Sequence, residues 1–129
     1  MILVDTSVWI EVFRRAPRFS LDHLLSFDDV VTTPPIQQEL LQGFRDTSAY
    51  RRARVALVAL PTVDAPLPLE RFLEAAELYR AARAVGITPR SSVDCLIAAS
   101  AIHHDLEVLH ADRDYVGIAR VSSLRQRAV

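Results

Sequence analysis

The first apolar segment of the chain constrains the fold more than any other feature. Ile2-Leu3-Val4 is apolar at consecutive positions, which is typical of a strand covered by helices on both faces. The segment ends at Asp5-Thr6-Ser7, residues that favour a turn into a helix. We therefore expect a buried strand of an α/β fold, with an acidic residue at its carboxyl end.

Strand-like and helix-like segments alternate along the rest of the chain. The sequence predicts helices over residues 8 to about 15, 20–26, 36–44, 48–59, 69–85 and 91–103, and strands at 30–33, 61–63, 107–110 and 120–121. Such alternation favours a three-layer α/β/α domain around a central, mostly parallel sheet of about four to five strands. The carboxyl ends of those strands would share one edge, where open parallel sheets bind their ligands.

Length and composition fit one domain over residues 1–129. Half of the residues are hydrophobic and 24% are charged, a mix typical of ordered globular domains. The first residues lack a basic leader, and Asp5 and Glu11 interrupt the apolar run, so we expect neither a signal peptide nor a membrane span, and a cytoplasmic protein. The single cysteine, Cys95, lies in an apolar run and is expected to be a buried, non-catalytic side chain.

The charge is nearly balanced, but every basic residue is arginine. The net charge is -1, and the 15 basic residues include no lysine. A genomic base bias explains this composition, yet arginine also suits phosphate binding. The near-neutral balance argues against tight nonspecific binding to nucleic acid, so phosphates would be held locally. Candidates for that role, each of which could equally be an ordinary solvated arginine, are Arg51, Arg52, Arg54, Arg90 and Arg113.

Acidic residues occur where the expected strands end or the following helices begin. They are Asp5, Glu39, Asp94, Asp112 and Asp114. Carboxylates that converge repel one another, and a divalent cation relieves that repulsion. Oxygen ligands of this kind select Mg²⁺ or Mn²⁺. With such a site, hydrolysis of a phosphodiester requires no Ser, Cys or His nucleophile.

Each acid also has a purely structural interpretation. Asp5 is placed to cap the first helix, and Ser91 with Asp94 three residues later approximates a capping box. Glu39 alone resembles an ordinary solvated helix residue, and Asp112-Arg113-Asp114 fits an Asx turn. The conjunction favours function, because four independent coincidences would have to fall at the same edge of the sheet.

Other chemistries fit the sequence less well. His103 and His104 are adjacent and point in different directions on a helix, so they do not form a zinc site with Cys95. His110 is expected to be a satisfied interior histidine or a group behind the acids. A phosphoacceptor receiver domain needs a lysine, and a haloacid-dehalogenase-type phosphatase needs an Asp where Ser7 stands.

Four segments together resemble a known family. They are Met1 to Ile10, Gln38 to Gly43, Asp94 to Ala99 and His110 to Tyr115. In this order they resemble the PIN-domain family, specifically its VapC-type toxins, and the resemblance extends to about residue 120. Tyr115 stands where the family more often has Phe, a change that keeps the aromatic packing.

The resemblance implies a Mg²⁺- or Mn²⁺-dependent endoribonuclease. Asp5, Glu39, Asp94 and Asp112 would match the family's acidic tetrad and Asp114 its frequent extra acid, with Thr6 or Ser7 as the supporting hydroxyl. It also implies neutralisation by a small DNA-binding antitoxin, a homodimer and an RNA substrate. The alternative is a catalytically silent PIN-like interaction module, which the complete acid set disfavours.

Overall fold

A four-stranded parallel sheet forms the centre of the protein. The computed structural model describes residues 1–14, 17–18 and 20–129. Within these residues the strands are β1 (Ile2–Val4), β2 (Val30–Val31), β3 (Glu107–His110) and β4 (Arg125–Ala128). Their order is β2-β1-β3-β4, and all neighbouring pairs are parallel. The predicted α/β fold with a parallel sheet is confirmed.

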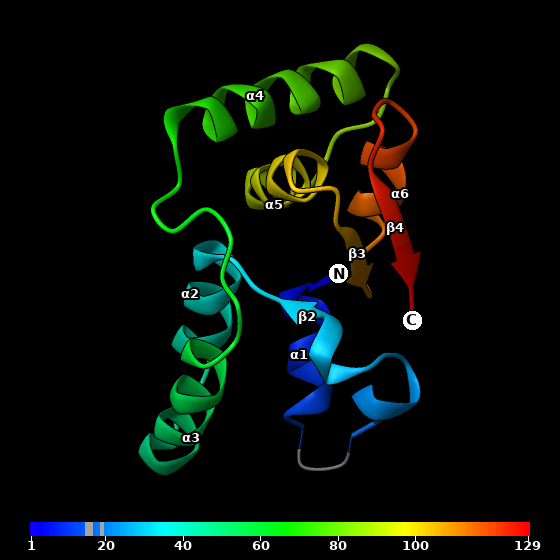
Figure 1. The fold of residues 1–129 in the computed structure, drawn as a ribbon. Helices are drawn as coiled ribbons and strands as arrows, with labels where there is room; N and C mark the ends of the chain where they lie inside the picture. The colour runs from blue at the N-terminus through cyan, green and yellow to red at the C-terminus, as the bar shows by residue number, and fades with distance from the viewer. Residues whose placement is uncertain (15–16, 19) are drawn as a thin grey trace.

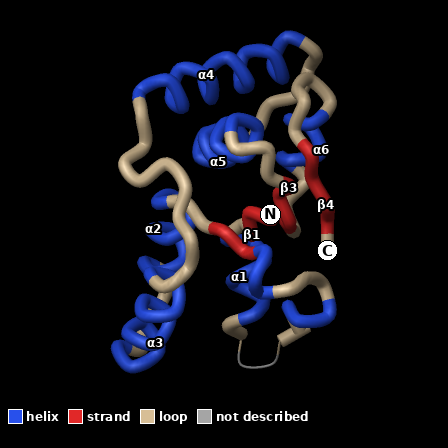
Figure 2. The backbone as a smooth tube through the Cα atoms, viewed as in Figure 1, coloured by secondary structure: helices blue, strands red, loops and turns tan. Residues whose placement is uncertain are grey.

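Helices cover both sides of this sheet. They are α1 (Thr6–Val12), α2 (Pro34–Gln42), α3 (Thr47–Val58), α4 (Leu69–Ala84), α5 (Ser92–His103) and α6 (Asp114–Ala119). Helix α1 packs against α2 on one side, whereas α5 packs against α4 and α6 on the other (Figure 1). Figure 2 shows α2 and α3 together at one side of the molecule and β4 at the opposite side, next to α6.

Helix α5 is central to the packing because the sheet, α4 and α6 all contact it. Its sequence is apolar almost all round, as expected for a helix buried on several sides. Cys95 is 1% exposed and belongs to this core, which confirms its expected burial. The small side chains of Ala98 and Ala101, both fully buried, leave room for neighbouring elements to approach closely.

The strand order creates a topological switch point between β1 and β3. The chain leaves β1 toward β2 on one side, and β3 lies on the other side of β1 and leads to β4. The backbone N–H of Asp5 donates to the carbonyl of Leu109 at 2.9 Å, so the carboxyl ends of β1 and β3 lie together. In open α/β sheets this crevice is the usual ligand site.

Two predicted elements are wrong. The expected helix over 20–26 is replaced by two short 3₁₀ turns, Leu21–His23 and Phe27–Asp29. The Ser26 hydroxyl accepts the N–H of Asp28 and so begins the second turn. Residues 120–121, expected to be a strand, form the turn that follows α6, and the last strand lies at 125–128.

Other boundaries differ by smaller amounts. The strand expected at 61–63 is a single bridge between Thr32 and Thr62. Helix α1 ends at Val12, with Phe13 as its cap, and the end predicted near Arg15 lies outside the described residues. Among the described helices, none combines the length and apolar character needed to cross a membrane.

Candidate metal centre

Three carboxylates converge at the switch point. Asp94, in the first turn of α5, and Asp112 and Asp114, which follow β3, each offer an oxygen within 4.8 Å of the others. Asp94 is 6% exposed, and its Oδ2 has no hydrogen-bond partner among the described residues. A buried, unpartnered carboxylate oxygen is costly unless a cation binds it. We refer to Asp94, Asp112 and Asp114 as the acidic triad.

Asp5 lies beside the triad and is joined to it by a tyrosine hydroxyl. The Tyr115 hydroxyl donates to Asp5 Oδ1 at 2.6 Å and lies 3.4 Å from Asp94 Oδ1. Tyr115 is fully buried, so this hydroxyl is a fixed donor between two acids. The sequence predicts that Tyr115 packs as an aromatic residue, but not that its hydroxyl binds Asp5. The place of a tyrosine in the sequence does not show where its hydroxyl points.

Glu39 is held at the border of the site by Thr6. Thr6 Oγ1 donates to Glu39 Oε1 at 3.2 Å, which links the start of α1 to the middle of α2. Burial, together with the negative charges of Asp5 and Asp112, raises the pKa of Glu39, and the hydrogen bond from Thr6 only partly opposes this shift. Glu39 is therefore close enough to interact electrostatically with Asp5 and Asp112. It is not one of the three acids whose oxygens lie within 4.8 Å of one another.

Ser7 fixes the position of Asp5 from two directions. The backbone N–H and the hydroxyl of Ser7 both donate to Asp5 Oδ2, at 3.0 and 2.5 Å. The same hydroxyl accepts the N–H of Ala111 at 2.9 Å, so it also ties α1 to the end of β3. Asp5 is thus the N-cap of α1 and also lies beside the acidic triad, so its structural role is compatible with the predicted functional one.

Arg90 and its backbone hold the other side of the triad. The N–H groups of Arg90 and Ser91 donate to Asp114 Oδ2 at 2.8 and 3.3 Å. The Arg90 guanidinium donates to Asp112 Oδ1 at 2.9 Å. The structure therefore brings Arg90, one of the five candidate arginines, to the site, a contact that sequence order could not reveal.

Burial and the neighbouring charged groups shift the pKa values of these acids. Burial, together with the negative charge of Asp5, raises the pKa of Asp94 to about 8. Burial acts in the same direction on Asp112, but the N–H of Asp114 and the Arg90 guanidinium outweigh it and hold the pKa of Asp112 below its usual range. Without a cation, Asp94 consequently keeps a proton while Asp112 is ionised.

The Asx turn and the helix cap that the sequence predicted around the remaining acids are also present. The N–H of Asp114 donates to Asp112 Oδ1 at 2.9 Å, as in an Asx turn, and Ser91 caps α5 by accepting the N–H of Val93. His110 is 1% exposed and contacts Gln126 Oε1 through Nε2 at 2.6 Å, while its Nδ1 accepts the N–H of Asp112. It is a satisfied interior histidine behind the acids.

Comparison with known proteins identifies the family of this chain. Residues 2–122 match the PIN domain family. Ribonuclease VapC11 of Mycobacterium tuberculosis and VapC ribonuclease Mb1587 of Mycobacterium bovis are each 38% identical to this chain, covering 97% of it and 96% of the relative. The match to the PIN domain defines the family and its fold, and the identity to the VapC ribonucleases indicates the branch of that family.

Solved structures share the same fold. VapBC2 from Rickettsia felis, bound to a DNA fragment from its promoter, has a TM-score of 0.77 at 17% identity and covers 100% of this chain and 99% of its own. VapBC-5 from Mycobacterium tuberculosis has a TM-score of 0.73 at 22% identity, covering 98% and 97%. The chain belongs to the PIN-domain family, in its VapC-type branch.

Proposed function

We propose that this protein is a metal-dependent endoribonuclease toxin that hydrolyses RNA phosphodiester bonds and is neutralised by a cognate antitoxin. The acidic triad carries the proposal, because three carboxylates share one small volume and one of their buried oxygens has no partner among the described residues. The 38% identity to VapC ribonucleases over nearly the whole chain supports the same activity. We place its action in the cytoplasm, where RNA is available.

The residues present fit a divalent cation. Their ligand atoms are carboxylate oxygens, which suit Mg²⁺ or Mn²⁺. Asp94, Asp112 and Asp114 would hold the cation, with Asp5 and Glu39 at its border as the remaining acids of the proposed catalytic set. When bound, such a cation activates water and stabilises the leaving oxygen of a phosphodiester.

Side chains around the acids keep this arrangement in place before any ligand arrives. Tyr115 donates to Asp5, and Ser7 donates to the other oxygen of the same carboxylate. Thr6 orients Glu39. Because these donors come from elements that pack in the core, the carboxylates are preorganised and lose little freedom when a cation binds.

The antitoxin is proposed to bind along α1 and α2. A hollow of about 350 Å³ there is lined mostly by apolar side chains, together with Arg14 and Glu39. Ile10 and Phe13 line it and are 52% and 41% exposed. An amphipathic segment would bury these residues, and a basic side chain at its end would pair with the acids.

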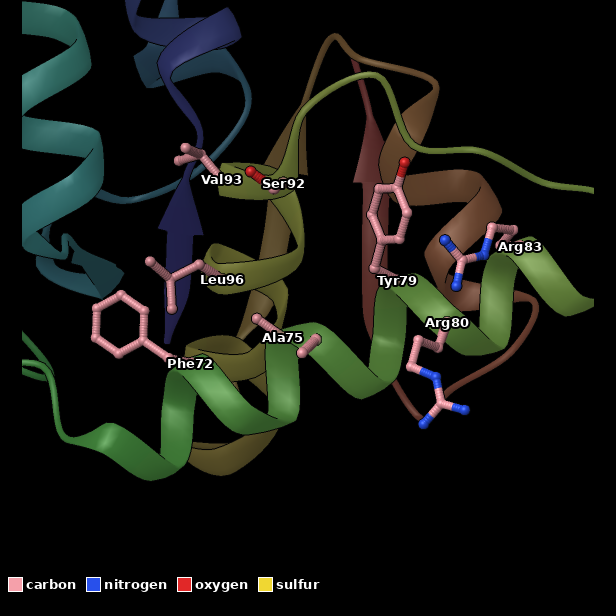
Figure 3. Close-up of a pocket in the computed structure, with 9 residues that line it drawn as sticks. Phe72, Ala75, Tyr79, Arg80, Arg83, Ser92, Val93 and Leu96 are labelled. Carbon is pink, nitrogen blue, oxygen red and sulfur yellow. The ribbon is translucent and has the colours of Figure 1, made fainter.

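A second copy of the chain is proposed to cover α4. Figure 3 shows Phe72, Tyr79 and Leu96 around a groove between α4 and α5, with Arg80 and Arg83 at one end. Phe72 is 48% exposed and the adjacent Leu73 is 56% exposed. Apolar side chains of this size that lie together on a surface favour an interface.

The experiment that tests the activity is cleavage of RNA by the purified protein in Mn²⁺ or Mg²⁺. Cutting is expected with the cation, and it should stop in EDTA and in the Asp5→Ala and Asp94→Asn variants. A catalytically silent interaction module would leave RNA intact under every condition. Intact RNA across a transcriptome-wide assay, with a folded protein and bound cation, would therefore overturn the proposed function.

A further inference from the structure

Arg90 is anchored by its backbone, and its exposed side chain pairs with two carboxylates of the acidic triad. Its N–H donates to Asp114 Oδ2 at 2.8 Å, which anchors the loop between α4 and α5. The side chain is 60% exposed. Its Nη2 lies 2.9 Å from Asp112 Oδ1, and its Nε lies 3.6 Å from Asp114 Oδ1.

The Arg90 guanidinium pairs with carboxylates that would also bind the cation. Asp112 and Asp114 are two members of the acidic triad. Among the ion pairs of the described residues, those made by these two acids both come from Arg90. An arginine and a divalent cation therefore compete for the same negative charge.

The exchange is energetically accessible because the guanidinium is exposed: the Arg90 side chain is 60% exposed, whereas the side chains of Asp112 and Asp114 are 25% and 6% exposed. Exposed pairs contribute little stability and are screened by salt, whereas a divalent cation interacts with all three carboxylates at once. The anchored backbone keeps the released guanidinium at the rim of the site. Its planar fork matches the oxygens of a phosphate.

We propose that Arg90 is an exchangeable counter-ion, which neutralises Asp112 and Asp114 in the absence of a divalent cation and holds a phosphate of the RNA substrate in its presence. This inference depends on the proposed function, since it assigns a substrate contact to the same site. Arg90 is thus a substrate-binding residue that also sets the affinity for the cation.

The first test measures Mn²⁺ binding by titration calorimetry, without RNA. Arg90→Gln removes the competitor, so Mn²⁺ affinity should rise by about two- to fivefold, the range expected for displacing an exposed ion pair. Arg120→Gln, at the exposed end of α6, makes the same change in net charge and should alter the affinity less than Arg90→Gln does. An unchanged or lower affinity in Arg90→Gln would contradict the exchange.

The second test measures binding of a short single-stranded RNA in Mn²⁺. Both arginine variants are made in an Asp5→Asn background, which keeps the triad and is expected not to cut. Arg90→Gln should weaken binding by about three- to tenfold and reduce the slope of log affinity against log salt by about 0.7, the loss of one phosphate contact. Arg120→Gln should leave both quantities unchanged.

The combined outcomes separate this inference from the proposed function. If Arg90→Gln binds Mn²⁺ more tightly and RNA more weakly than the unaltered protein, the exchange is supported. Unchanged RNA affinity and salt slope in a protein that cleaves RNA would overturn the role of Arg90 alone. If the unaltered protein binds Mn²⁺ but neither binds nor cuts RNA, the proposed function fails, even where Arg90→Gln still changes Mn²⁺ affinity.

Discussion

Asp94→Asn is predicted to stabilise the cation-free protein at neutral pH while it abolishes cleavage. The carboxylate is 6% exposed, faces Asp5 and Asp112, and has one oxygen without a partner among the described residues. An amide keeps the shape, removes the charge and can donate to neighbouring carboxylates. Because an amide does not titrate, folding of the variant no longer requires a buried carboxyl to take up a proton at neutral pH, in contrast to most changes of a buried polar group.

The magnitude follows from the raised pKa of Asp94. Burial and the charge of Asp5 move this pKa from 3.8 to about 8. At 1.36 kcal/mol per pH unit, the shift sets an upper limit of about 5 kcal/mol near pH 7.5. Water reaches the partly exposed Asp112 and Glu39 and screens the cluster, so we expect a stabilisation of about 1–3 kcal/mol.

The sign of the pH dependence is also defined. A carboxyl whose pKa is higher in the folded state destabilises the fold progressively as pH rises from about 4 to about 8. The advantage of Asp94→Asn should thus be small near pH 4.5 and largest near pH 8. Urea unfolding in EDTA at several pH values measures it, with the exposed Asp22→Asn as the matched control. A variant that is less stable than the unaltered protein at pH 7.5 would refute the reasoning.

Three further predictions concern the surrounding groups. Tyr115→Phe should lower the free energy of unfolding by about 1–2 kcal/mol, because the buried carboxylate of Asp5 loses a hydrogen-bond donor. Urea unfolding measures this change, and the control variant Tyr50→Phe should leave the free energy of unfolding unchanged. Mn²⁺ affinity should increase from pH 6 to pH 8, since Asp94 must lose its proton first; calorimetry showing a flat profile would contradict this. Asp64→Ala should lower the free energy of unfolding by about 2–3 kcal/mol, because buried Arg71 loses one of its two carboxylate partners and keeps only the more exposed Glu74; thermal unfolding measures this loss.

Sequence reasoning located the acids because their positions follow from topology. An apolar strand that ends in Asp5, and another that ends just before Asp112, place both residues at one edge once the sheet is parallel. Asp94 follows from the capped start of α5. The structure places Asp94, Asp112 and Asp114 close together and Asp5 and Glu39 at the border of this group, and the role of these acids in binding a metal stays a prediction.

The contacts that tune the site were not predictable in the same way. The Tyr115 hydroxyl reaches Asp5 across 110 positions of sequence, and Arg90 reaches Asp112 from a loop without a pattern. Strand β4 was also missed, because an edge strand needs few apolar residues: Arg125 and Arg127 pair with Asp105 and Glu107 instead. The charged and polar residues of this edge strand do not form the apolar pattern from which a strand is predicted.

Direct location of a bound cation tests the central claim. We predict that crystals grown with Mn²⁺ show one anomalous difference peak between the carboxylates of Asp94, Asp112 and Asp114, at about 2.0–2.2 Å from oxygens of this triad. The Arg90 guanidinium should have moved away from Asp112. A fully occupied Mn²⁺ site elsewhere, with the triad empty and Arg90 still paired, would contradict the assignment of this cluster as the metal centre.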